Sequence, residues 1–123
     1  MTLRSVSSHP DAAMMLSFAR ECREILAGKK AEDILLIDLR SVSTYLDFFL
    51  ICTASSRIQA RALAKEIRRF MQENGVTAAI TPDMESEWIV LDFGYLVVHV
   101  FTHESRQYYN LEKLWADAER LTS

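Results

Sequence analysis

The sequence is poor in residues that interrupt or cross-link a fold. Its 123 residues include three glycines, two prolines and two cysteines, and there is no low-complexity tract. This composition argues against a disordered chain or a flexible linker. Cys22 and Cys52 have no Cys-x-x-Cys neighbour and no histidines at matching spacing. Such a pattern is typical of a reduced intracellular protein rather than of a disulfide framework or a zinc site.

Long hydrophobic segments are also missing. No apolar run approaches the roughly 18 residues that a helix needs to cross a bilayer. Residues 1–10 lack the apolar core of a signal peptide and contain one arginine, too few for a transit peptide. We therefore expect a cytoplasmic protein without a membrane partner. We further expect residues 1–10 to be frayed and residues 11–123 to form a single domain.

Motifs for phosphate binding, metal binding or covalent catalysis are absent. The sequence has neither Gly-x-x-x-x-Gly-Lys nor Gly-x-Gly-x-x-Gly. Its three histidines have no carboxylate or cysteine at ligand spacing, and no serine or cysteine is placed by the sequence as a nucleophile for His99. We expect no catalytic residue, no metal, no cofactor and no small-molecule substrate.

Charge is distributed unevenly along the chain, although the net charge is only −3. Residues 82–123 contain eight acids and three bases, which favours a basic protein surface as partner over nucleic acid. Residues 56–74 contain five bases and two acids. Four of these bases, at helical spacing, predict a basic stripe that is either a solvated helix face or a contact for ribosomal RNA or an acidic partner: Arg57, Arg61, Lys65 and Arg68.

Hydrophobic periodicity predicts eight elements in the order α-β-β-α-β-β-β-α, an α/β sandwich around a mixed five-stranded sheet. Helices are expected from residue 11 to about 28, from Ser55 or Ser56 to 74, and over 111–121. Strands are expected over 34–39, 47–53 and 76–80, followed by a hairpin over 88–101. The strands at 34–39 and 47–53 are nearly continuous apolar runs, as in strands buried on both faces.

The hairpin has two unequal faces if Gly94 and Tyr95 form its turn. The pairs on one face are entirely apolar: Phe93 with Leu96, Leu91 with Val98, and Ile89 with Val100. The other face pairs Trp88 with Phe101, Val90 with His99, and Asp92 with Val97. We expect the core not to need this second face, and we place the functional surface there.

Each candidate on that surface also has a structural interpretation. His99 in a strand is typical of a structural hydrogen-bonding residue, and Asp92 before the turn can accept turn amides or bind a partner. Trp88 is either a core-rim aromatic or an interface hot spot. Arg106 can form an ion pair with Glu112 or Asp92.

Three blocks, in order, resemble the Iojap family of ribosomal silencing factors. Residues 47–56, Asp-Phe-Phe-Leu-Ile-Cys-Thr-Ala-Ser-Ser, are similar to a family strand that leads into a helix start. Residues 88–94 and 97–101 resemble its hairpin, and residues 106–115, Arg-Gln-Tyr-Tyr-Asn-Leu-Glu-Lys-Leu-Trp, resemble its closing motif. The resemblance covers about residues 12–120. The sequence departs from the family pattern at Ala54, usually glycine, and at Tyr95, usually aspartate.

The resemblance implies a factor that docks on large-subunit ribosomal protein fourteen (uL14) and blocks joining of the small subunit, repressing translation. It also implies a nucleotidyltransferase-like fold and a homodimer in the free state. The expected partner-binding residues are Trp88, Asp92, Tyr95, His99, Arg106 and Tyr109. Two alternatives stay open. One is a metal-dependent nucleotidyltransferase, although this sequence lacks the second carboxylate near Asp92 that such chemistry needs. The other is a structural homodimer whose seam is the polar-aromatic face.

Overall fold

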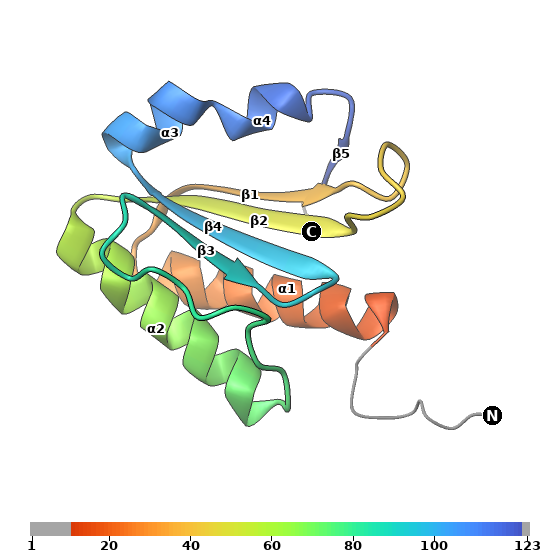
Figure 1. Ribbon diagram of the computed structural model, residues 1–123, viewed down its shortest axis with the longest axis horizontal. Helices are drawn as coiled ribbons and strands as arrows, with labels where there is room; N and C mark the ends of the chain where they lie inside the picture. Colours follow the sequence, from red (N-terminus) through yellow and green to blue (C-terminus); the bar gives the residue numbers. More distant parts are fainter. Residues whose placement is uncertain (1–10, 122–123) are drawn as a thin grey trace.

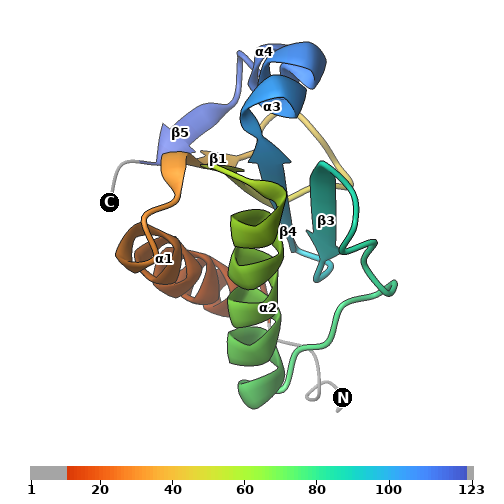
Figure 2. The same cartoon turned by 90° about the vertical axis from the view of Figure 1, so that its left-hand side faces the viewer.

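The computed structural model describes residues 11–121, so the prediction for residues 1–10 lies outside the described part of the chain. Two helices cover one face of a five-stranded sheet, and two shorter helices cross the other face (Figures 1 and 2). The elements are α1 (Ala12–Gly28), β1 (Glu32–Asp38), β2 (Phe48–Ala54), α2 (Arg57–Glu73), β3 (Trp88–Asp92), β4 (Leu96–Thr102), α3 (His103–Tyr109), α4 (Leu111–Leu114) and β5 (Glu119–Leu121). The strand order is β3-β4-β2-β1-β5.

The sheet is mixed because β2 and β4 run parallel, whereas the other neighbouring strands are antiparallel. The hairpin register is confirmed: Trp88 lies opposite Phe101 and Leu91 opposite Val98. Gly94, at φ 89°, supplies the left-handed backbone that the turn requires. The predicted α/β class and mixed five-stranded sheet are therefore correct.

Local signals explain the two long helices. The Asp11 side chain accepts a hydrogen bond from the Met14 amide and caps α1, and Ser56 caps α2 through the Gln59 amide. Each helix buries one stripe against the sheet, including Ala19 and Leu26 of α1. Together with one face of the strands, these stripes form the larger of two hydrophobic cores.

The opposite face of the sheet also has a core, so the prediction that the core does not need it was wrong. Phe101 is fully buried and His99 is 5% exposed. The smaller core consists of Ile37, Leu39, Phe49, Ile51, Val97, Phe101, Leu111 and Ala118. Strand β4 lies inside the sheet, and α3, α4 and the following turn cover this face next to it (Figure 1). Only part of the face therefore stays open.

The fifth strand is at the C-terminal end of the described chain, which corrects two predictions. Residues 76–80 form no strand, and only one backbone bond, from the Ala79 amide to the Asp92 carbonyl (2.7 Å), joins them to β3. Residues 111–121 do not form one helix: α4 ends after four residues, and a turn then leads into β5. Glu119–Leu121 instead pairs with the open edge of β1. The observed order is α-β-β-α-β-β-α-β, if α3 and α4 are counted as one helical segment.

Candidate functional site

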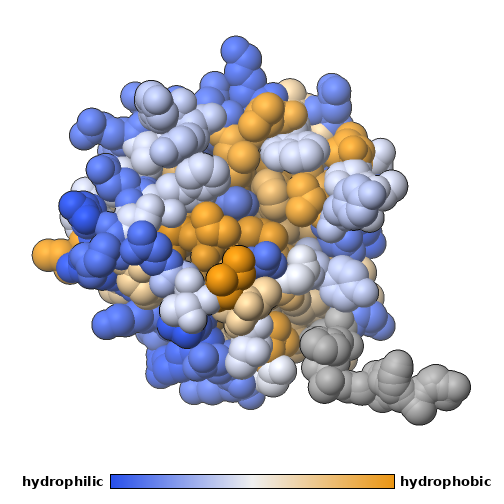
Figure 3. Space-filling model, viewed as in Figure 1, coloured by the Kyte–Doolittle hydropathy of each residue, from blue (hydrophilic) through white to orange (hydrophobic). Residues whose placement is uncertain are grey.

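The least covered part of the second face lies over β3, because the residues that β4 contributes to this face are buried. Figure 3 shows hydrophobic side chains gathered across the middle of this side of the molecule. Aromatic and aliphatic side chains of the hairpin and α3 are partly exposed: Val90 is 37% exposed, Tyr95 46% and Tyr109 48%. We define the aromatic face as Trp88, Val90, Asp92, Tyr95 and Tyr109. Exposed apolar groups gathered in one patch are typical of an interaction surface.

Trp88 is held in one orientation by its neighbours. Its indole Nε1 donates a hydrogen bond to Nδ1 of His99 at 2.9 Å. Its ring stacks on Phe101, with centroids 5.1 Å apart, and contacts Tyr109 at 4.6 Å. The half-buried indole is therefore an oriented group at the edge of the aromatic face.

His99 lies beneath this surface rather than on it. Its ring packs against Phe49, with centroids 4.5 Å apart, and burial lowers its pKa to about 4. The imidazole is neutral near pH 7, and because Nδ1 accepts from Trp88, Nε2 carries the proton. Nε2 is buried and has no hydrogen-bond partner among residues 11–121. The structure thus gives His99 a supporting position under Trp88.

Asp92 and Tyr95 lie at the turn of the hairpin. Asp92 Oδ1 accepts a hydrogen bond from the Gly94 amide at 2.9 Å, as expected for a carboxylate that stabilises a turn. The Tyr95 carbonyl accepts from the Phe48 amide at 2.9 Å, which fixes the turn to β2. The Tyr95 side chain remains about half exposed.

Arg106 joins four elements inside the protein. Its side chain is 12% exposed and forms an ion pair with Glu112 of α4, with Nη2 2.9 Å from Oε2. Its Nη1 also donates to the hydroxyl of Thr53 in β2 (2.8 Å) and to the carbonyl of Asp33 in β1 (2.9 Å). The Glu112 pairing predicted from the sequence is confirmed. Arg106 therefore anchors α3 and α4 on the sheet and holds Tyr109 beside Trp88.

The predicted basic stripe is partly neutralised by the segment between α2 and β3. Arg57 Nη2 donates to the Glu85 carbonyl at 2.6 Å, and Arg61 forms an ion pair with the Glu85 carboxylate at 3.0 Å. Lys65 is exposed and Arg68 is half-buried. Contact of this stripe with ribosomal RNA or an acidic partner stays a prediction.

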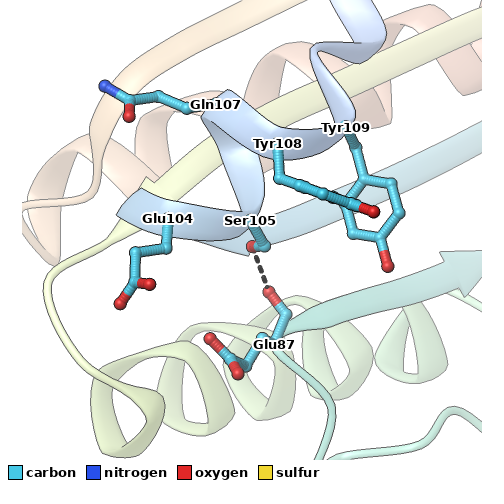
Figure 4. A pocket seen from close by; sticks show the side chains of 6 residues that line it. All are labelled: Glu87, Glu104, Ser105, Gln107, Tyr108 and Tyr109. Carbon is cyan, nitrogen blue, oxygen red and sulfur yellow. Dashed lines mark hydrogen bonds between the residues drawn. The ribbon is translucent and has the colours of Figure 1, made fainter.

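A pocket adjoins the aromatic face beneath α3 (Figure 4). Its volume is about 550 Å³, and it is lined by Glu87, Glu104, Ser105, Gln107, Tyr108 and Tyr109. Of these, only Tyr109 was predicted as a site residue. Both glutamates belong to the acidic half of the sequence, but nothing local indicates that they share a pocket, because 17 positions separate them.

Residues 11–121 offer no arrangement of three or more histidine, cysteine or acidic side chains suited to a metal ion. Within the same residues, no helix combines the length and the apolar character needed to cross a membrane.

Comparisons with known proteins agree on one family. The sequence model described as "Ribosomal silencing factor during starvation" matches residues 12–123. The chain is 46% identical over 91 residues to the ribosomal silencing factor RsfS of Bacillus subtilis, covering 73% of this chain and 77% of that protein. It is 33% identical over 108 residues to the chloroplastic protein Iojap of Zea mays, covering 88% of this chain and 47% of that protein. A crystal structure from Chromobacterium violaceum matches with a TM-score of 0.76 at 30% identity, covering 87% and 88% of the two chains. A crystal structure from Bacillus halodurans matches with a TM-score of 0.73 at 35% identity, covering 90% of this chain and 99% of that chain.

Proposed function

This chain belongs to the ribosomal silencing factor family, and from that premise we propose that it docks on large-subunit ribosomal protein fourteen through its aromatic face. The bound protein then prevents the small subunit from joining and so represses translation. The observation that carries the proposal is the oriented Trp88 indole beside the half-exposed Tyr109 ring. Tryptophan and tyrosine are among the residues most enriched in interface hot spots.

The electrostatics of the surface support a basic protein as partner. Asp92 belongs to the aromatic face, and Glu87 and Glu104 line the adjoining pocket. No salt bridge within residues 11–121 involves any of these three carboxylates. Complementary charge speeds encounter and sets the register of docking, whereas aromatic burial supplies most of the affinity.

The mechanism is steric occlusion and requires no turnover. The protein has only to dissociate from the large subunit more slowly than small subunits arrive. The proposal therefore assigns no enzymatic activity. We place this activity in the cytoplasm, and we propose that the free protein is a homodimer that separates before docking.

The test is sedimentation of purified ribosomal subunits at a magnesium concentration that permits joining, with and without the protein. Comigration with the large subunit and loss of the joined particle are expected. Trp88→Ala should weaken binding by about 2 kcal/mol or more, because it removes an interface aromatic. Ile58→Ala is the matched control, since Ile58 is 73% exposed on α2, outside the aromatic face.

Absence of wild-type protein from the large-subunit peak would refute the proposal. If Trp88→Ala is folded and binds with unchanged affinity, docking uses another surface. Circular dichroism and thermal unfolding of both variants supply the folding control.

A further inference from the structure

The pocket beneath α3 has two carboxylates that the protein itself does not neutralise. Figure 4 shows the side chains of Glu87 and Glu104 directed into the same space below the helix, whereas Gln107 points away. Neither carboxylate forms a salt bridge within residues 11–121. The nearest cation in sequence, Arg106, is bound to Glu112, Thr53 and Asp33 instead. The pocket therefore has a net negative charge.

The wall of the pocket is held in position by hydrogen bonds. The Glu87 carbonyl accepts from the Ser105 hydroxyl at 2.6 Å and from the Thr102 amide at 3.1 Å. The Glu87 carboxylate accepts from the Thr102 hydroxyl at 3.2 Å. Residue 87, immediately before β3, is thus fixed to the beginning of α3, so the protein's own hydrogen bonds hold this wall of the pocket in place.

Two tyrosine rings complete the pocket. Tyr108 is 81% exposed and Tyr109 48% exposed, and their rings meet edge to face with centroids 5.0 Å apart. Tyr109 also contacts Trp88, so the pocket is continuous with the aromatic face. Exposed π faces beside two carboxylates suit a planar cation, and they disfavour phosphate groups, which carry negative charge themselves.

We propose that this pocket receives an arginine side chain of the docked protein partner, an inference that rests on the proposed function. A guanidinium group can donate hydrogen bonds to carboxylates while its plane stacks on a tyrosine ring. Lysine, a compact and strongly hydrated charge, fits this combination less well. The pocket volume of about 550 Å³ is ample for one such side chain.

The first test measures the pocket without the ribosome. Isotope-labelled protein is titrated with N-acetyl-arginine methylamide, followed by amide chemical shifts, and separately with the matching citrulline compound, its neutral analogue. Saturable shifts are expected at residues 87 and 104–109 with the arginine compound alone. They should vanish in the Glu87→Gln/Glu104→Gln variant and persist in Glu24→Gln, an exposed glutamate on α1. Equal shifts with citrulline, or none with arginine, would overturn the inference.

The second test measures affinity for purified large subunits. Glu87→Gln/Glu104→Gln should bind about three- to tenfold more weakly than wild type, and the difference should shrink as salt is raised. Because Glu104 lies in the first turn of α3, its substitution can also change the stability of the fold, and thermal unfolding of the variant is the control for that effect. Unchanged affinity of this variant, with Trp88→Ala impaired, would refute the arginine pocket and leave the docking function standing. Failure of the wild type to bind would refute both.

Discussion

Replacing Arg106 with methionine should destabilise the fold by about 3 kcal/mol. Loss of one partner of a buried ion pair costs about 3–5 kcal/mol, because the other charge is left uncompensated. Here the two side chains are 12% and 24% exposed, which favours the lower end of that range. Thr53, 2% exposed, also loses the donor to its hydroxyl oxygen, which adds to the cost.

Urea unfolding measures this loss directly. With a slope of about 1–3 kcal/mol/M for a small domain, the midpoint should fall by about 1–3 M while the slope stays unchanged. Arg20→Met, on the exposed side of α1, is the matched control and should leave the midpoint in place. The double variant Arg106→Met/Glu112→Leu should recover much of the stability, because it removes the unpaired carboxylate as well.

The same pair gives a pH signature. Burial raises the pKa of Glu112, but the hydrogen bonds and charge of Arg106 outweigh it, so the pKa is lowered overall. A lowered carboxyl pKa contributes stability above the unfolded pKa, and that contribution is lost as pH falls through the folded pKa. The difference between wild type and Arg106→Met should therefore narrow in acid. A loss below about 1 kcal/mol at pH 7 would refute this reasoning and class the pair with screened surface salt bridges.

Two further substitutions test the hairpin and its support. Because the pKa of His99 is lowered to about 4, its contribution to stability is complete above about pH 6.5 and is lost, by up to about 3 kcal/mol, as pH falls towards 4. Over this pH range, the urea midpoint should change less in His99→Gln than in wild type. The same change of the midpoint with pH in both proteins would contradict the assignment of this titration to His99. Gly94→Ala should lower the free energy of unfolding, measured by thermal unfolding, by about 1 kcal/mol. The cause is backbone strain at a φ of 89°, since no atom lies within 4 Å of the added Cβ. Gly28→Ala, equally uncrowded and without positive φ, should be neutral or stabilising, and equal effects at both positions would refute the backbone argument.

The hairpin and the two long helices could be predicted because their signals are local. Alternation about Gly94 specifies the register, and capping residues specify where α1 and α2 begin. The fifth strand could not be predicted in the same way, since Glu119–Leu121 is too short for a periodic pattern. Leu111, Leu114 and Ala118 imitate a helical stripe, yet Leu114 is 74% exposed. The open edge of β1, a tertiary feature, determines the pairing of β5.

In the candidate site, too, features with local signals could be predicted and features that depend on tertiary contacts could not. Trp88, Tyr95 and Tyr109 were predicted as site residues, and the structure leaves each at least partly exposed near the hairpin or α3. The buried position of His99 was not predicted, because it depends on coverage of the sheet by elements distant in sequence. Nor could the sequence indicate that Thr53 and Asp33 bind Arg106, since 53 and 73 positions separate them.

The proposed docking surface and the smaller core are parts of one structure. Phe101 is fully buried in that core and also forms the support on which Trp88 stacks. The hydrogen bond to His99 restricts Trp88 further, so much of the side-chain entropy that docking would cost is already lost on folding. Affinity should therefore depend on residues that no partner touches. A change at His99 that preserves the fold but frees the indole should weaken docking mainly through faster dissociation.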